Sequence, residues 1–600
     1  MASNVSDVFR LEPKVTRFLP APIAGLLTRP LERLLSVRRA ARAYAKLGTR
    51  GDAAAFAARS LAALGVRFRL RGLPDAIPQH GPVIVIANHP YGGIEGLYLY
   101  AELAARRGDV RVLGHHLLSQ LPDFAPVVFG VDALAGRSAA ARNAGALRRA
   151  LRWLKGGGAL LVFPSPEVSV FDPVTRTALD RPWHPSIARL VDLARAPVVP
   201  VFVDGSNSAL FHAVGLVHPR ARQALLSREL FNKRRHVMTV TVGPCLPAAQ
   251  LAAIDGDGAL TEQLRLRLYA LACWRDARAA EPAPPPAAAE PGAAERIACE
   301  LAALRPGARL AQSGDFEVWA APPGAAPALL AELARLRAVT AGSASAAPDA
   351  FDRDGTQLVV FNARTREVAA ACRVAGVRQS LRRRGRGGLL SAAAFELGRP
   401  LRRSLSGALE LGRIVVHPAY REHLAPLPLL WKGVAGYLAR SPEYRVLLLT
   451  AHLDERYSPA AQALVTGYLT GRHGSRRGRR LVRARGRAQG TATALRLLRR
   501  EGATIGALEA LEALLRSIEA DGRGLPPLLR QALQLGAVVL GCNGGREAAG
   551  STDVLLLVEL DALEPERLAR FLGRDAAGRF AGAARGGHLR ATTLRLIATP

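Results

Sequence analysis

The chain has 600 residues, more than one hydrophobic core normally organises, so we expect two or more domains. A hydrophobic fraction of 49% excludes a mainly disordered chain. The formal net charge of +33 comes almost entirely from arginine and would attract nucleic acid, anionic lipid or an acidic protein, although such a composition is equally typical of a G+C-rich genome.

The first 60 residues are predicted to form a basic amphipathic segment. Residues 17–47 alternate apolar clusters with arginines at roughly helical spacing. This pattern is typical of a membrane-surface helix pair, or of helices packed on their own domain, which is the commoner case. We find neither a secretory signal pattern nor an apolar run long enough to span a bilayer. The five widely spaced cysteines suggest neither a disulfide framework nor a zinc cluster, so we expect no metal and a reducing cytoplasm.

Residues 61–274 are predicted to form an α/β domain. Strand-like runs such as VIVIAN, ALLVFP and VVPVFV alternate with helical stretches such as NAGALRRALRWLKGG and HPSIARLVDLAR. This alternation favours a mainly parallel sheet covered by helices.

His89 is the first candidate for catalysis in this domain. The VIVIAN run ends at Asn88 and His89, and ligands of parallel sheets bind at the carboxyl ends of the strands. A neutral imidazole can take a proton from an attacking hydroxyl when a carboxylate orients it, and Glu95 is six residues away. Gly92 and Gly93 would allow a tight turn and close approach of an acyl group. The alternative for the histidine and the carboxylate is ordinary helix capping.

Residues 275–296, rich in alanine and proline, are predicted to be a linker. Residues 297–600 then indicate a mixed α+β domain with a C-terminal extension. TQLVVFN and EVAAACRV form a predicted hairpin, followed by the strand ALELGRIVVHP and a helix from about Leu427. The tail from about Ile505 is predicted to contain two helices separated by a turn and then a pair of strands.

A second basic tract spans residues 471–490. Its glycine and arginine content predicts a solvated loop. Nucleic-acid binding would require interleaved aromatic residues, and the tract contains none, so we expect no nucleic-acid partner.

The first domain resembles the glycerolipid acyltransferase superfamily. The matching blocks are ANHPYGGIEG, VFPSPEVS and APVVPVFVDG, and the wide spacing with two glycines is similar to the hemolysin-like branch. The resemblance implies that His89 is the base and Glu95 its orienting acid, in place of the usual aspartate. The arginine-bearing second block of the family is not evident in LGHHLLSQLPDF. The substrate site implied by the resemblance comprises Asn88, Gly92, Gly93, Phe163, Pro164, Glu167 and Ser169.

The second domain resembles the GNAT-like N-acyltransferases that make lyso-ornithine lipid and, more distantly, acyl-homoserine-lactone synthases. LELGRIVVHPAYR is its most specific piece. A GNAT fold implies two splayed strands, at which a backbone amide polarises a thioester and an acid handles the amine's proton. The resemblance implies Glu410 as the acid, Arg413 as an anion clamp, and Asp352 and Arg373 as substrate-site residues. The alternative is that Glu410 and Arg413 simply pair with each other across a strand edge. Residues Arg421–Pro426 lack a glycine-rich pyrophosphate turn, which favours acyl carrier protein over coenzyme A as donor.

The order of the two domains resembles that of a bifunctional ornithine-lipid synthase. In that scheme the second domain joins a 3-hydroxyacyl chain to the α-amino group of an amino acid, and the first acylates the free hydroxyl of the lyso-lipid. The expected co-substrates are acyl carrier protein thioesters, with no further cofactor. The expected location is peripheral, on the anionic inner face of the cytoplasmic membrane.

Three alternatives remain open from the sequence. The same two-step enzyme could use another amino acid. A lysophospholipid acyltransferase could be fused to a degenerate GNAT module that only binds. A basic nucleic-acid-binding protein is the third, and His89, Glu95 and the Phe163-Pro164 pair oppose it.

Overall fold

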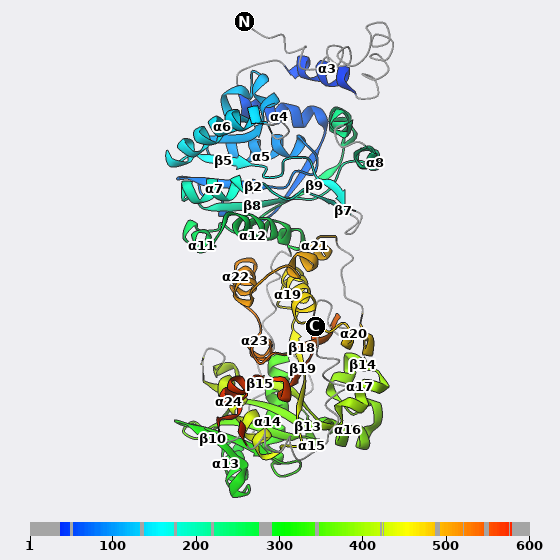
Figure 1. Ribbon diagram of the computed structural model, residues 1–600. Helices are drawn as coiled ribbons and strands as arrows, with labels where there is room; N and C mark the ends of the chain where they lie inside the picture. Colours follow the sequence, from blue (N-terminus) through cyan, green and yellow to red (C-terminus); the bar gives the residue numbers. More distant parts are fainter. Residues whose placement is uncertain are drawn as a thin grey trace. The chain divides into compact units, whose positions relative to one another are not determined.

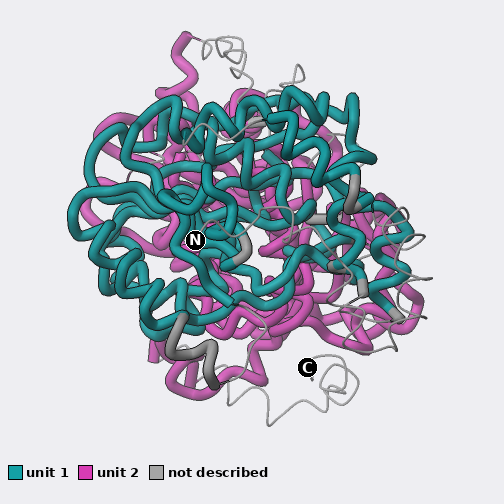
Figure 2. Tube along the Cα trace, turned by 90° about the horizontal axis from the view of Figure 1, so that it is seen from above, with its two compact units in different colours: residues 1–276, 491–498 teal, residues 277–490, 499–600 magenta. Residues whose placement is uncertain are grey.

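The computed structural model divides the chain into two compact units, residues 1–276 with 491–498 and residues 277–490 with 499–600 (Figure 2). The boundary after residue 276 falls in the predicted linker. The structure describes residues 36–47, 52–132, 137–172, 177–217, 221–274, 291–341, 347–420, 423, 425–486, 493–519, 521–544, 551–574 and 577–578.

The first unit is built on a seven-stranded sheet in the order β1-β9-β8-β2-β5-β3-β4 (Figure 1). Neighbouring strands are parallel except at β8 and β9, so the predicted, mainly parallel sheet is confirmed. The strands are β1 (Arg67–Gly72), β2 (Val83–Ala87), β3 (Val110–His115), β4 (Val128–Val131), β5 (Ala159–Val162), β8 (Val198–Val203) and β9 (Val237–Val242).

Helices cover both faces of this sheet. Successive residues of its central strands are apolar, so apolar side chains point to both faces and need partners on each. All five residues of β2 are buried. Val83 and Val85 belong to a core cluster with Phe56 of α4 and Leu99 of α5. The helices are α3 (Val37–Leu47), α4 (Ala53–Leu64), α5 (Ile94–Ala104), α6 (Arg137–Lys155), α7 (Ser186–Ala194), α8 (Ala209–Val217), α9 (Ala221–Ala224), α10 (Leu226–Asn232), α11 (Ala248–Ala252) and α12 (Asp257–Ala270), beside the small hairpin of β6 (Val170–Asp172) and β7 (Thr177–Leu179).

The end of the predicted basic amphipathic segment is part of this core. Helix α4 is capped by the Asp52 side chain, and its Phe56 and Ala57 are buried against the sheet. Tyr44 and Leu47 of α3 pack against the same cluster, so the described end of the arginine-rich tract, residues 36–47, follows the commoner alternative, helices packed on their own domain. Residues 1–35 of the segment lie outside the described residues.

The second unit is built on an eight-stranded sheet in the order β10-β11-β12-β13-β15-β16-β19-β18. The predicted hairpin is β12 with β13, and the predicted terminal pair is β18 with β19. All neighbours are antiparallel except β15 and β16, so the mixed α+β prediction is confirmed. The strands are β10 (Arg309–Ser313), β11 (Phe316–Ala321), β12 (Thr356–Asn362), β13 (Glu367–Gly376), β15 (Ala408–Val416), β16 (Val446–Leu453), β18 (Val538–Gly544) and β19 (Thr552–Glu559), with β14 (Phe395–Leu397) and β17 (Val482–Ala484) forming a separate pair.

Helices α14 and α18 pack on opposite faces of this sheet. Leu333 of α14 contacts the face that carries Val359, whereas Gly433 of α18 lies against Val318 on the other face. The helices are α13 (Ala293–Ala302), α14 (Pro327–Ala341), α15 (Ala350–Asp354), α16 (Val377–Arg384), α17 (Arg399–Ser404), α18 (Pro426–Arg440), α19 (Pro459–Arg472), α20 (Gly478–Leu481), α22 (Leu508–Ile518), α23 (Pro527–Gln534) and α24 (Pro565–Leu572), and α21 (Thr493–Gly502) spans the boundary between the units.

Two predicted irregular segments are partly regular. Helix α13 begins at Ala293, so the last four residues of the predicted linker are helical. The tract of residues 471–490 is not a solvated loop in its described part, because it contains the end of α19, all of α20 and strand β17. Val482 of β17 packs with Phe395 and Leu540 in a core cluster, and these apolar partners outweigh the polar composition of the tract.

None of the helices in the described ranges has both the length and the apolar composition needed to cross a bilayer.

Candidate active site

The histidine and glutamate predicted from the sequence lie side by side at the carboxyl edge of the parallel sheet. His89 follows β2, and Glu95 lies in the first turn of α5. The distance between Nδ1 of His89 and Oε1 of Glu95 is 2.9 Å. The N–H direction is not aligned for a hydrogen bond, a geometry common in catalytic pairs without bound substrate. The contact occupies Nδ1, so Nε2 is the nitrogen that can face the hydroxyl of a substrate.

Glu95 orients the imidazole and caps its own helix at the same time. The carboxylate is fully buried, and its Oε1 accepts hydrogen bonds from the amides of Tyr91 and Gly92 at 3.0 and 2.9 Å. Oε2 accepts one from Gly93 at 3.1 Å. Burial favours a raised pKa for Glu95, but the charge of His89 and these amides hold the pKa below its ordinary value. The contact with His89 that catalysis would require and the capping contacts, which the sequence presented as alternatives, are made by one anionic side chain.

The carboxylate also changes the basicity of His89. Burial favours a lowered pKa for this imidazole, but the charge of Glu95 and its contact with the ring outweigh burial and raise the pKa above its usual 6.5. The side chain is 22% exposed, so it remains accessible from outside. The phenyl ring of Phe163 lies 4.8 Å from the imidazole, between ring centroids. A tilted aromatic neighbour restricts the ring to one orientation and lines the approach to it.

A third acidic residue, Asp180, supports the loop of His89 and was not predicted from the sequence. Its Oδ1 accepts hydrogen bonds from the His89 amide at 3.2 Å and from the Ser169 hydroxyl at 2.6 Å. Its Oδ2 accepts one from Trp183 at 3.1 Å, and burial raises the pKa of Asp180. The one signal in the sequence is an aspartate between the short apolar run TAL and RPW, which is weak without knowledge of the fold.

Three residues predicted to bind substrate make contacts that hold the framework together. The Asn88 side chain donates a hydrogen bond of 2.8 Å to the carbonyl of Val203 and accepts one of 2.7 Å from its amide. These two bonds tie the end of β2 to β8. Ser169 is buried, donates to Asp180, and its amide donates to the His89 carbonyl at 2.9 Å. Gly92 adopts a φ of 90°, which favours glycine, and a side chain there would collide with Leu226.

The predicted tight turn at Gly92 is therefore present, but protein atoms fill the space that was assigned to an acyl group. The amide of Gly93 is likewise engaged by Glu95. Both amides are thus unavailable for binding a negatively charged oxygen.

The block that follows β5 places its predicted residues differently. Phe163 is half-buried beside His89, whereas Pro164 is buried. The Glu167 carboxylate forms an ion pair with the buried Arg222 and lies 3.6 Å from Arg181. The resulting cluster places two arginines near this block, which the sequence blocks of the domain did not reveal.

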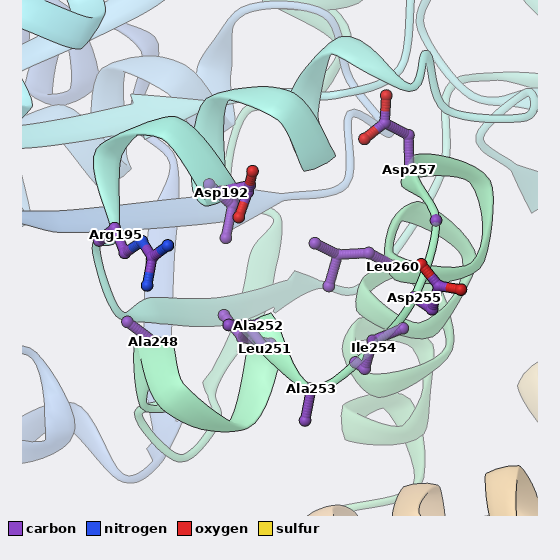
Figure 3. A pocket seen from close by; sticks show the side chains of 12 residues that line it. Asp192, Arg195, Ala248, Leu251, Ala252, Ala253, Ile254, Asp255, Asp257 and Leu260 are labelled. Atoms are coloured by element: carbon purple, nitrogen blue, oxygen red, sulfur yellow. The ribbon is translucent and has the colours of Figure 1, made fainter.

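A pocket of about 280 Å³ lies at the opposite edge of the same sheet (Figure 3). It is lined by the end of α7, by α11 and by the start of α12, with Asp192, Arg195, Asp255 and Asp257 among its side chains. Arg195 precedes β8, whereas His89 follows β2, and these two strands are parallel. The pocket therefore lies away from the catalytic candidates.

Within the described residues, one group of side chains has a composition suited to a metal ion. Ligand atoms of His115, His116 and Asp132, at the ends of β3 and β4, lie within 4.8 Å of one another. Burial and the neighbouring His116 lower the pKa of His115, which favours the neutral form that binds metals. His115 and Asp132 are half-buried and His116 is exposed, and we assign this group no part in the chemistry considered below.

The second unit contains the splayed strands that the GNAT resemblance implies. Strands β15 and β16 pair in parallel only from Ala408 to Leu411 with Val446 to Leu449. Beyond these residues β15 stays paired with β13, and β16 with β19. The two strands therefore separate at the bulge of β15, where Arg413 has a φ of 52°. Positive φ at a non-glycine residue is uncommon and stores backbone strain.

The four residues predicted in this unit converge in one charged network. Arg413 donates to Asp352 at 3.0 Å and forms an ion pair with Asp349. Asp352 also accepts from Arg337 at 2.7 Å. Arg373 donates to the carbonyl of Phe351 at 2.6 Å and lies 3.7 Å from Glu410. Asp349 and Arg337 are additional members that were not predicted.

The network corrects one reading of the sequence. Glu410 and Arg413 do not pair with each other across the strand edge. Glu410 faces Arg373, and its oxygens accept hydrogen bonds of 2.9 to 3.0 Å from the main chain of Leu390 and from the amide and hydroxyl of Ser391. Both Glu410 and Arg373 are buried, and burial lowers the pKa of Arg373 against the opposing charge of Glu410. The bulge at Arg413 places the two side chains in separate ion pairs.

A histidine that the sequence did not single out lies on the same sheet face. His452 of β16 lies four residues after Leu448, which pairs with Glu410, so the side chains of all three point to one face of the sheet. Nδ1 of His452 lies 2.8 Å from Asp553 of β19. This contact raises the pKa of His452, and the imidazole is exposed. In contrast to Glu410, the ring is accessible to an incoming amine. Residues 421, 422 and 424, on which the missing pyrophosphate turn was inferred, lie outside the described residues.

Comparisons with known families find one match in each of the two units. Residues 12–270 match the family model described as Acyltransferase, and residues 337–432 match that of the Acetyltransferase (GNAT) domain. Among curated proteins no match was found. The protein is an acyltransferase, with one domain of an acyl-transferring family in each of its two units.

Proposed function

We propose that the protein makes an aminolipid in two acyl transfers, of which the ornithine lipids are one class. The second unit would join a 3-hydroxyacyl group to the α-amino group of an amino acid. The first unit would then acylate the hydroxyl of that lyso-lipid. The observation that carries the proposal is the buried Glu95 carboxylate against Nδ1 of His89, which leaves Nε2 to accept a hydroxyl proton.

In the first unit, Nε2 of His89 removes the proton as the hydroxyl oxygen attacks the thioester carbonyl. The carbon–sulfur bond breaks, and the imidazolium returns the proton to the departing thiolate. Glu95 stabilises the imidazolium formed between these events, since its own pKa is held low. Asp180 holds the His89 main chain, so the base stays at the sheet edge.

In the second unit, the amine attacks the thioester where β15 and β16 separate. Main-chain amides freed from strand pairing at this opening can polarise the carbonyl. Arg413 fixes the bulge through Asp349 and Asp352. Glu410 was the expected acid, and its saturated hydrogen bonds support a role in holding Arg373 and the turn at Ser391.

Acyl carrier protein is the proposed donor for both steps, because an acidic partner complements a chain of net charge +33. The location we propose is the inner face of the cytoplasmic membrane, where the lyso-lipid is available.

Expression in a host that lacks aminolipids, followed by mass spectrometry of its lipids, tests the proposal. The wild-type chain should yield a diacyl aminolipid. His89→Ala should accumulate the monoacyl form, because the second unit is unaltered, and a general base contributes about a hundredfold to ten-thousandfold. Normal diacyl product from a folded His89→Ala protein would contradict the assignment. Acylation of lysophospholipid alone would favour a degenerate second unit.

A further inference from the structure

Large apolar side chains are exposed on the carboxyl edge of the first sheet, on both sides of His89. Leu210 and Leu216 of α8 are 44% and 65% exposed, and Val237 at the start of β9 is 57% exposed. Leu118, which follows β3, is also exposed. Helix α8 follows β8, and β9 runs antiparallel to β8, so all four residues lie at the edge where β2 ends in His89. We call these four residues the edge patch.

Helix α8 is apolar on both sides. Its buried side packs Phe211 against Val168 and Leu225. Its outer side exposes Ala209, Leu210, Ala213 and Leu216, a spacing that forms one stripe along a helix. His212 is the single polar residue of the helix. A leucine exposed alone needs no explanation, whereas a stripe on an apolar helix indicates an apolar partner.

Charge distinguishes this edge from the opposite one. Arg234, Arg235 and His236 are exposed immediately before Val237. At the opposite edge, the exposed Leu193 lies beside Asp192, and the pocket there carries Asp255 and Asp257 together with Arg195. Acidic and basic groups are mixed at that edge, whereas a run of exposed basic residues adjoins Val237, so an anionic surface would favour the His89 edge.

Helix α8 is also connected to the catalytic loop. The Asn207 side chain donates to the carbonyl of Tyr91 at 3.2 Å, and Ser208 donates to the buried Glu229. Lys233 lies 3.3 Å from Glu229 and donates to the carbonyl of Ser206. These contacts fix the start of the helix beside Tyr91, two residues after His89, and Leu216 in the last turn of the helix is exposed.

We propose that the edge patch docks the first unit on an anionic lipid bilayer, with the outer stripe of α8 inserted at the level of the headgroups. This docking places the His89 edge at the depth where the hydroxyl of a monoacyl lipid is found. The inference rests on the proposed function for its substrate, whereas docking itself is independent of turnover. It assigns the bilayer contact to α8 and β9 rather than to the basic N-terminal segment.

Flotation with vesicles measures the docking directly. We compare the full-length chain with vesicles of phosphatidylglycerol and phosphatidylcholine and with vesicles of phosphatidylcholine alone. The double variant Leu210→Glu, Leu216→Glu should lower the partition onto anionic vesicles by at least about tenfold, because two charges replace inserted leucines. Leu193→Glu is the matched control, as this leucine is 56% exposed in the same unit, and it should change nothing. Thermal unfolding verifies that both proteins fold.

A second variant tests the charged component. Arg234→Glu, Arg235→Glu should weaken binding to anionic vesicles and leave the weaker binding to phosphatidylcholine unchanged. Undiminished vesicle binding by the Leu210, Leu216 double variant, or an equal loss with Leu193→Glu, would overturn the proposal. So would a loss of binding to acyl carrier protein while vesicle binding persists.

Failure of the proposed function can be distinguished from failure of the docking proposal. His89→Ala should bind vesicles as well as the wild type. If the wild-type protein binds vesicles through the edge patch but makes no aminolipid, the docking proposal stands and the proposed function is refuted.

Discussion

The main-chain amide of His89 donates a hydrogen bond of 3.2 Å to Oδ1 of Asp180, a residue 91 positions later in the chain. The same oxygen accepts the hydroxyl of Ser169, whose amide donates to the carbonyl of His89. The loop that carries the base is therefore held from both sides by one buried carboxylate and one serine. Glu95 determines the orientation of the ring, and Asp180 determines where the ring stands.

Asp180→Asn should lower O-acylation by about tenfold to a hundredfold without affecting N-acylation, because a displaced base loses alignment with the hydroxyl. The ratio of monoacyl to diacyl lipid, together with kcat and KM measured separately, provides the readout. Asp192→Asn, at the opposite sheet edge, is the control and should have no effect. An unchanged ratio for Asp180→Asn would show that the loop holds its position without this anchor.

The rate of O-acylation should rise with pH through a midpoint above 6.5, because the base acts as neutral imidazole and Glu95 raises the pKa of His89. Glu95→Gln removes the negative charge, leaves burial as the main influence, and should move the midpoint downward. Stability responds in the opposite sense. The pair of protonated His89 and ionised Glu95 stabilises the fold below the ordinary imidazole pKa of 6.5. This contribution is lost as the pH rises through the raised pKa of His89. Rate profiles and thermal unfolding at matched pH values check both.

Arg413→Ala should abolish N-acylation, and with it both lipid products, because the bulge loses its ion pairs to Asp349 and Asp352. Arg413→Lys should recover little activity, since an ammonium cannot reproduce the forked geometry of a guanidinium. Arg364→Ala, which removes an exposed ion pair with Asp315, is the control. Monoacyl lipid from folded Arg413→Ala would refute the assignment.

Glu410→Ala should destabilise the second unit by about 3–5 kcal/mol, because it leaves the buried Arg373 without its counter-charge. Glu410→Gln keeps the shape and most hydrogen bonds and should cost less. Thermal unfolding shows which of the two variants is less stable. The N-acylation rate of folded Glu410→Gln then shows whether Glu410 takes part in the reaction or only stabilises the fold. If that variant transfers acyl groups at the wild-type rate, Glu410 is not the acid, and exposed His452 becomes the residue to substitute.

Acyl carrier protein thioesters should be better donors for N-acylation than coenzyme A thioesters of the same chain. The motivation is the sequence of residues 421–426, which offers no glycine-rich turn for a pyrophosphate. Initial rates at equal thioester concentrations decide the question. Equal or reversed rates would count against a carrier protein donor.

Local contacts were predicted and distant ones were not. The pairing of His89 with Glu95 depends on a strand end, a turn and the first turn of a helix, all within seven residues, so the spacing carried the information. Asp180 and Asn207 reach the same loop from about 90 to 120 residues away, so their sequence surroundings carry at most a weak signal of this contact.

In the second unit, the residues of the network were predicted but not their partners. A direct pair between Glu410 and Arg413 was the alternative to their roles in the site, yet the bulge in β15 directs them to separate partners, Arg373 and Asp352. A bulge inserts one residue into a strand and redirects the side chains that follow. Composition was equally insufficient for residues 471–490, where a few apolar contacts decide the fold.

In the proposed mechanism, the double engagement of Glu95 makes the start of α5 part of the catalytic apparatus. One carboxylate both closes the first turn of this helix and holds the imidazole, so fraying of that turn withdraws the partner of the base. Helix ends open at lower free energy than cores. On heating, O-acylation should therefore fail before the sheet beneath it melts, and the temperature limit of the enzyme is set by a single helical turn rather than by the stability of the whole domain.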